Sequence, residues 1–139
     1  MSAAIALQHI VSGYGESVVL RGVSFELGEN EAVAVMGKNG MGKSTLLKTI
    51  LGYLPKKSGA VTILGKNVTH WKPYRIARLG IAYAAQEHSF FADLSVYDNL
   101  ALGLKQQFYF PEYFREILQW FPVFEDRLSQ PAGTLSGGE

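Results

Sequence analysis

The sequence predicts an α/β fold with a strand-rich first part and a helix-rich last part. Three observations support this prediction. Aliphatic segments with strand-like alternation occupy much of the first 65 positions, two short runs are almost wholly apolar, and apolar residues recur at helical spacing after residue 94.

Composition narrows the class of protein. Of the 139 residues, 47% are hydrophobic and 18% are charged, which is typical of a folded globular chain. The net charge of +1 predicts no nucleic acid partner, and the absence of cysteine excludes disulfides and thiolate metal sites. Because no apolar run approaches about 20 residues and residues 1–10 lack a basic segment, a soluble, cytoplasmic chain is expected.

Five segments of the first part are predicted to be strands. The first should end in a turn at residues 12–15, and the second is one strand or a broken pair with Gly22 at a bulge. Two of them, EAVAVMG and IAYAAQ, are nearly all apolar, as expected for buried parallel strands. The predicted strands are residues 4–15, 17–27, 31–37, 59–65 and 81–86.

Four helices are predicted from apolar spacing and end signals. Gly52 helps to end the first, Pro73 precedes the second, Ser95 caps the third, and Pro111 starts the fourth. The short basic pair at residues 56–57 is expected in a solvated loop. The predicted helices are residues 43–52, 74–80, 95–104 and 111–121.

A phosphate-binding loop (P-loop) is the most informative motif of the chain. Gly37, four residues, Gly42, Lys43 and Ser44 fit the P-loop pattern, between an apolar run and a periodic helix. The glycines let backbone N–H groups approach phosphate oxygens, and the helix start adds its positive dipole end. Lys43 should reach the β- and γ-phosphates, Ser44 should bind Mg²⁺, and the Thr45 N–H could meet the α-phosphate. This motif alone leaves transporter ATPases, kinases and GTPases open.

Four features in order distinguish these classes. Tyr14 in SGYG precedes the loop GKNGMGKSTLLKTILG, Gln86 follows in IAYAAQE, and the chain ends in LSGGE. With these motifs the whole chain resembles the first part of the nucleotide-binding subunit of an ABC transporter. The last motif matches the family's signature sequence, which is the most class-specific of the four.

The resemblance implies a role for each motif. Tyr14 would stack on adenine, and Gln86 would sense Mg²⁺ and the attacking water and touch the transmembrane subunit. Ser136, Gly137 and Gly138 would meet the γ-phosphate held by a second subunit in a head-to-tail dimer. Metal contacts would come from Ser44 and Gln86. The residues expected to bind ATP are Tyr14, Gly37, Asn39, Gly40, Gly42, Lys43, Ser44, Thr45, Ser136, Gly137 and Gly138.

Several longer segments are similar to the ATPase subunits of importers for branched-chain amino acids, urea or amides. They are GMGKSTLLKTILGYLP, SGAVTILG, IARLGIAYAAQ, FADLSVYDNL and GTLSGGE. The resemblance implies transmembrane permease subunits as partners, an indirect solute-binding protein, and a position on the cytoplasmic face of the cell membrane.

The same resemblance predicts the organisation of the chain. Residues 1–93 would form a β-rich core with an antiparallel β-subdomain, and residues 94–139 a partial helical subdomain ending in the signature. The family continues with the Walker B strand, its Asp and Glu, and a switch histidine, so the domain is expected to be incomplete at its C-terminus. Residues 1–139 alone are therefore expected to bind ATP·Mg²⁺ weakly or not at all and to hydrolyse it negligibly. The alternative is a non-catalytic nucleotide-binding or interaction module.

Some positions depart from the family's pattern. Asn30 stands in a turn where glycine is usual, and it tolerates left-handed backbone. Ala85 and Glu87 flank Gln86 where proline and a small residue are common, which could change the stiffness of that loop. Five aromatic residues are either core of the helical subdomain, which the sequence favours, or a docking surface: Phe108, Tyr109, Phe110, Tyr113 and Phe114.

Overall fold

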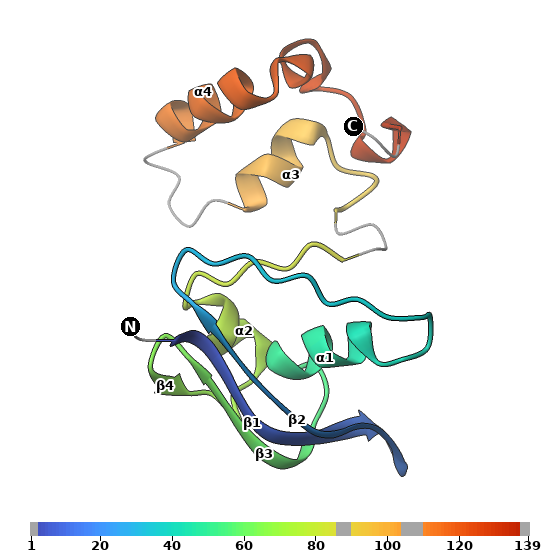
Figure 1. Cartoon of the computed structure of the whole chain (residues 1–139). Helices are drawn as coiled ribbons and strands as arrows, with labels where there is room; N and C mark the ends of the chain where they lie inside the picture. The colour runs from blue at the N-terminus through green and yellow to red at the C-terminus, as the bar shows by residue number, and fades with distance from the viewer. Residues whose placement is uncertain (1–2, 86–89, 104–109, 137–139) are drawn as a thin grey trace. The chain divides into compact units, whose positions relative to one another are not determined.

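The computed structural model describes residues 3–85, 90–103 and 110–136. The chain divides into two compact units, Met1–Tyr83 and Ala84–Glu139, and each is described by itself. The family-based division near residue 93 remains a prediction. Figure 1 shows strands and two helices in the first unit and helices in the second, in agreement with the predicted α/β class.

The first unit contains one antiparallel sheet. Its strands are β1 (Ala3–Tyr14), β2 (Ser17–Gly28), β3 (Lys56–Ile63) and β4 (Lys66–Asn67), in the order β2-β1-β3-β4. The long β1–β2 hairpin turns at residues 15–16 and is drawn in blue in Figure 1. β1 lies centrally because it pairs with both β2 and β3.

The predicted bulge in the second strand is confirmed. Ile10 pairs with Val23 and Val11 pairs with Arg21, which leaves Gly22 as the extra residue. Its φ of 80° is a left-handed conformation that glycine adopts without a steric penalty. The predicted turn at residues 12–15 is wrong at its start, because Ser12 and Gly13 still pair with β2.

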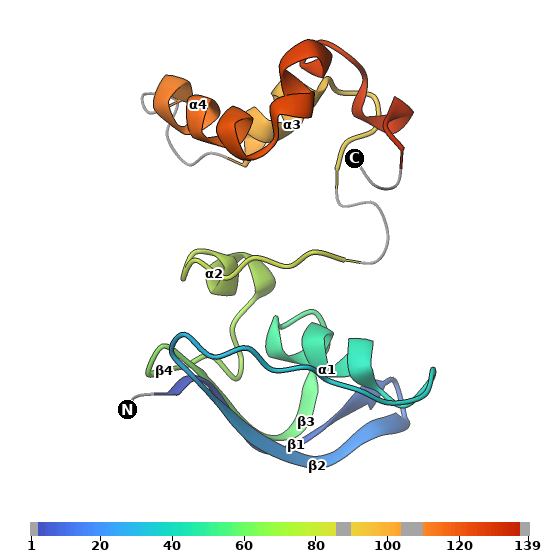
Figure 2. The same ribbon diagram turned by 45° about the horizontal axis from the view of Figure 1, so that its top comes forward.

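Two helices cover one face of this sheet, as both ribbon views show (Figures 1 and 2). They are α1 (Lys43–Ile50) and α2 (Pro73–Ala77), both at predicted places. Gly52 follows α1 with φ 77°, and Pro73 begins α2. The apolar part of the core between sheet and helices consists of Leu7, Ile10, Leu20, Leu46, Ile50, Val61, Ile63, Val68 and Ile76.

Two predicted strands are not strands in this structure. Residues 31–37 and 81–85 are without regular secondary structure, and Val33 and Met36 are 57% and 88% exposed. An apolar run predicts a preference for burial, but a strand also needs a neighbouring backbone to accept and donate its hydrogen bonds. No described segment forms a ladder with either run.

The basic pair also differs from the prediction. Lys56 and Lys57 do not lie in a loop but begin β3. Because alternate residues of a strand face opposite ways, Lys56 is half-buried while Lys57 is exposed. The Lys57 ammonium donates to the Glu16 carbonyl at 3.0 Å.

A buried pair of hydroxyls ties α1 to the sheet. Ser12 and Thr49 both have zero exposure, and their oxygens are 3.0 Å apart. Ser12 donates to the Pro55 carbonyl at 3.0 Å, so the single Thr49 proton is shared between Ser12 and the Thr45 carbonyl, 2.7 Å away. The pair thus joins β1, α1 and the start of β3.

Replacing Thr49 by valine tests this connection, because valine keeps the shape and removes the hydroxyl. We expect T49V to lower the free energy of unfolding of the first unit by about 1–2 kcal/mol, since Ser12 loses its buried donor. Urea denaturation in a Trp120→Phe background, followed by the fluorescence of Trp71, measures this change. Thr62→Val is the control, because that half-buried hydroxyl has no hydrogen bond among the described residues. Equal effects of the two changes would contradict the assigned role.

The second unit contains α3 (Val96–Leu102), α4 (Phe110–Trp120) and two short 3₁₀ helices, η2 (Pro122–Arg127) and η3 (Ala132–Thr134). The predicted cap is confirmed, because the Ser95 hydroxyl accepts from the Asp98 N–H at 3.0 Å. Backbone bonds from Val96 to Gln130 and from Ala132 to Leu94 fasten the last segment to the start of α3.

The aromatic residues of the second unit are only partly a core. Phe114 contacts Tyr97 edge to face, with ring centroids 5.3 Å apart. Tyr113 is instead 56% exposed, so it is not a core residue of this unit. Phe108 and Tyr109 lie outside the described residues, and the side chain of Phe110 does too.

Candidate nucleotide-binding site

The P-loop lies between the extended segment at residues 31–36 and the first turn of α1. Gly40 and Gly42 have φ of 83° and 92°, which is the left-handed region that glycine enters without a steric penalty. Gly42 is the N-terminal cap residue of α1, and its carbonyl accepts from the Leu46 N–H at 2.8 Å. The loop therefore ends in a bare backbone at a helix N-terminus, which is an arrangement suited to anions.

A side chain at position 42 would be crowded. A Cβ there would lie 3.0 Å from Val19 Cγ1 and 3.3 Å from Leu20 Cδ2, so β2 packs directly against the start of α1. The left-handed φ favours glycine here, and the close approach leaves little room for a side chain. The contact fixes the end of the loop against the sheet.

The Lys43 side chain folds back onto the backbone of the loop. Its ammonium donates to the Gly37 carbonyl at 2.7 Å and to the Lys38 carbonyl at 2.9 Å. These two carbonyls hold the positive charge at the mouth of the loop. Because an ammonium has three protons, one remains for a further acceptor. A phosphate oxygen placed there would form a charge-assisted hydrogen bond, which is stronger than a bond to a neutral carbonyl.

The two hydroxyl residues after Lys43 have different surroundings. Ser44 is exposed on the first turn of α1, where its hydroxyl can reach a ligand. Thr45 is 6% exposed, and its carbonyl accepts from Thr49. Sequence reasoning did not find Thr49 or Ser12, because nothing in the sequence pairs residues so far apart.

The remaining predicted site residues are placed as follows. Tyr14 ends β1 and is 48% exposed, and Asn39 is exposed in the turn of the loop. Ser136 is exposed in the second unit. Gln86, Gly137 and Gly138 lie outside the described residues, as do Glu87 and His88. Asn30, with φ 60°, adopts the left-handed backbone predicted for it.

Within the described ranges, no three histidine, aspartate or glutamate side chains are grouped closely enough to hold a metal ion. None of the helices in these ranges has the length and hydropathy that crossing a membrane requires.

The fold and the loop define a class, the α/β proteins that carry a P-loop. A family model described as ABC transporter matches residues 20–139. That match covers most of the chain, so this chain belongs to the ABC transporter family.

Individual relatives agree with this assignment. The chain is 38% identical over 132 residues to a probable branched-chain amino acid transport ATP-binding protein, LivF, of Archaeoglobus fulgidus, covering 92% of this chain and 55% of that protein. It is 33% identical over 137 residues to the high-affinity branched-chain amino acid transport ATP-binding protein BraG of Pseudomonas aeruginosa, covering 97% and 59%. The chain thus spans somewhat more than half the length of these relatives.

A solved structure supports the same fold. The chain is similar to the ADP conformation of an ATP-binding cassette of an ABC transporter, with a TM-score of 0.82 and 27% identity. The similarity covers 99% of this chain and 61% of that one. The α/β fold predicted from the sequence is confirmed.

Removing the Lys43 ammonium should loosen the loop. We expect Lys43→Met to speed hydrogen exchange of the Met41 amide several-fold, because that N–H donates to the Lys38 carbonyl, which also accepts from Lys43. Hydrogen–deuterium exchange with peptide resolution over residues 36–44 measures this. Lys48→Met on the last turn of α1 is the matched control, and an equal increase there would contradict the prediction.

Proposed function

We propose that this chain binds ATP through residues 37–45 as part of the ATP-binding subunit of an importer. The observation that carries the proposal is the geometry of the loop. Two glycines in left-handed conformation lead into α1, and the Lys43 ammonium lies against the loop carbonyls. Backbone N–H groups, a helix N-terminus and a lysine are the elements by which a P-loop holds phosphates.

Mg²⁺ would accompany the nucleotide. The exposed Ser44 hydroxyl at the helix start is the described group that would bind it, and the resemblance adds Gln86. When bound, the ion would neutralise phosphate charge during phosphoryl transfer. The part of Lys43 is to hold and orient the phosphates, and that of the glycines is to let the backbone approach them.

Tyr14 and the signature residues would complete the binding of the nucleotide. The ring of Tyr14 is about half exposed at the end of β1 and therefore free to stack on a base. Ser136, with Gly137 and Gly138, would contact a nucleotide held by a second subunit. This arrangement requires a head-to-tail pair of nucleotide-binding subunits.

The transported substrate is proposed from the relatives. Both LivF and BraG are named for branched-chain amino acid transport. We therefore propose that the subunit drives import of branched-chain amino acids or related small amides. Its partners would be transmembrane permease subunits, with a solute-binding protein acting indirectly, and it would work at the cytoplasmic face of the membrane.

The alternative is that residues 1–139 acting alone form a nucleotide-binding or interaction module without turnover. One observation favours it. The segment that leads into the loop is extended, exposed and unpaired with any described strand. A loop whose entry is not held by a ladder loses part of its preorganisation, and the 139 residues by themselves would then bind nucleotide weakly.

Nucleotide binding is tested by titrating Mg·ATP onto the chain and onto its Lys43→Ala variant. We expect the variant to lose about 10- to 100-fold in affinity, as for the loss of a charge-assisted hydrogen bond. Lys48→Ala is the control, because this lysine lies on the exposed face of the same helix. Equal affinity of the chain and K43A, measured by calorimetry, would exclude the loop as the binding site.

Hydrolysis is tested separately in single-turnover assays with excess chain over ATP. We expect residues 1–139 alone to release phosphate no faster than K43A, because the resemblance assigns the general base to the Walker B segment, which these residues do not include. Turnover at about 1 per second or faster, within the ordinary range of enzymes, would overturn this expectation.

A further inference from the structure

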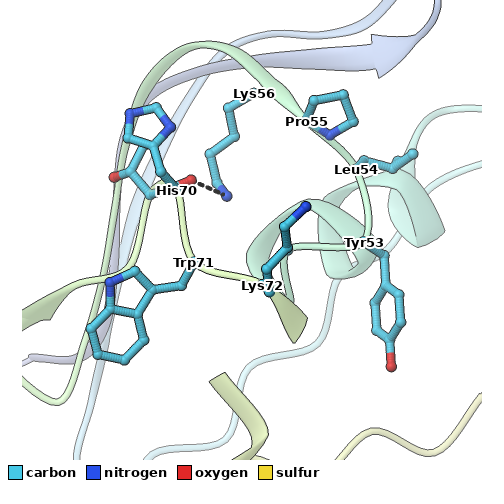
Figure 3. A pocket seen from close by; sticks show the side chains of 9 residues that line it. Tyr53, Leu54, Pro55, Lys56, His70, Trp71 and Lys72 are labelled. Carbon is cyan, nitrogen blue, oxygen red and sulfur yellow. Dashed lines mark hydrogen bonds between the residues drawn. The ribbon is translucent and has the colours of Figure 1, made fainter. Parts of the chain in front are cut away.

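A second pocket lies in the first unit, away from the P-loop residues. It is open, has a volume of about 320 Å³, and is lined by residues 52–56 and 69–72. Figure 3 shows these two segments facing each other, one from the end of α1 to β3 and the other leading into α2. The volume is in the range of pockets that bind small molecules.

Two lysines line this pocket, and its lining contains no carboxylate. Lys56 and Lys72 reach into the same opening from opposite sides, and His70 borders it (Figure 3). The Lys56 ammonium donates to the Thr69 carbonyl at 2.9 Å, which leaves two of its protons for other acceptors. No aspartate or glutamate is among the lining residues.

The burial of Lys56 is not compensated. Removal from water lowers the pKa of this lysine, as expected where no negative charge offsets the desolvation of the ammonium. An anion beside the Lys56 ammonium would offset this desolvation penalty, whereas a neutral or positive ligand would not.

The walls of the pocket are fixed by contacts of their own. A Cβ at Gly52 would lie 2.7 Å from the Trp71 carbonyl, so the two segments approach directly. Pro55 is held by the Ser12 hydroxyl, and the Thr69 hydroxyl accepts from the Val61 N–H at 3.0 Å. The pocket is therefore formed before any ligand arrives, which reduces the entropy lost on binding.

The remaining lining suits a carbon skeleton. Leu54 and Pro55 supply apolar surface, and Trp71 borders the pocket from the other segment. The Arg75 guanidinium lies 4.4 Å from the centre of the Trp71 ring and adds a further positive charge nearby. The lining thus offers apolar contact beside the two ammonium groups.

We propose that this pocket binds a small organic anion, whose carboxylate or phosphate group is held between Lys56 and Lys72. It is a second ligand site on the nucleotide-binding unit, and it stands on residues that the P-loop does not use. Carboxylate and phosphate share the required chemistry, which is a compact anion with several acceptor oxygens.

The test uses the fluorescence of Trp71 in a Trp120→Phe chain, where Trp71 is the only tryptophan because the sequence has two. Citrate and glycerol phosphate are titrated separately at constant ionic strength held with sodium chloride. We expect a saturable change for at least one of them, with Kd shifted about tenfold or more by Lys72→Met and by Lys56→Met. Lys57→Met is the matched control, since this neighbour on β3 does not line the pocket. Lys72 is exposed, so its variant tests the proposal even where K56M changes folding.

The same titrations in a Lys43→Ala background separate this site from the P-loop. A response to citrate alone identifies a carboxylate ligand, a response to glycerol phosphate alone identifies a phosphate ligand, and a response to both identifies the anion itself as the determinant. The proposal is overturned if neither anion gives saturation up to about 10 mM, the weak end of small-ligand affinity. It is also overturned if K72M has no effect or if K43A abolishes the response, and none of these results bears on ATP binding.

Discussion

The buried contact between Ser12 and Thr49 is the constraint on which the arrangement of the first unit depends. Most of the loop is exposed and joins the sheet through no ladder, so its position is set chiefly through α1. α1 in turn is held to β1 by two hydroxyls with zero exposure, and Ser12 extends the connection to Pro55. A change at Thr49 would therefore affect two regions. It would act on the P-loop through Thr45 and on the second pocket through Ser12 and Pro55.

Both candidate sites keep a lysine on neutral carbonyl oxygens. Lys43 donates to the carbonyls of Gly37 and Lys38, and Lys56 donates to that of Thr69. A carbonyl satisfies an ammonium without neutralising it, so the charge remains available to an anion that makes a stronger bond. A carboxylate partner in either place would have paired the charge and weakened binding of anionic ligands.

Local features of the fold were predictable because a few neighbouring residues determine them. Gly22 marks a bulge, Asn30 adopts left-handed backbone, and Ser95 caps a helix, each for a reason contained in its own turn. Residues 31–37 and 81–85 were predicted wrongly, because apolarity records which side chains avoid water but not which backbone will pair with theirs. The same limit applies to Ser12 and Thr49, which are 37 positions apart and meet only in the folded unit.

The two candidate sites also differ in how far each can be predicted from the sequence. The P-loop is contiguous, so its glycines, lysine and serine could be read as a phosphate site directly from their spacing. The second pocket is formed by residues from two separate segments. One of its lysines, Lys56, is followed by Lys57, which has a different environment. Lys56 is half-buried and Lys57 is exposed only because β3 begins at Lys56 and alternate side chains of a strand face opposite sides. The two lysines are identical in composition, and strand register alone gives them different roles. Lys56 can bind a ligand in the pocket, whereas Lys57 contacts the β1–β2 turn.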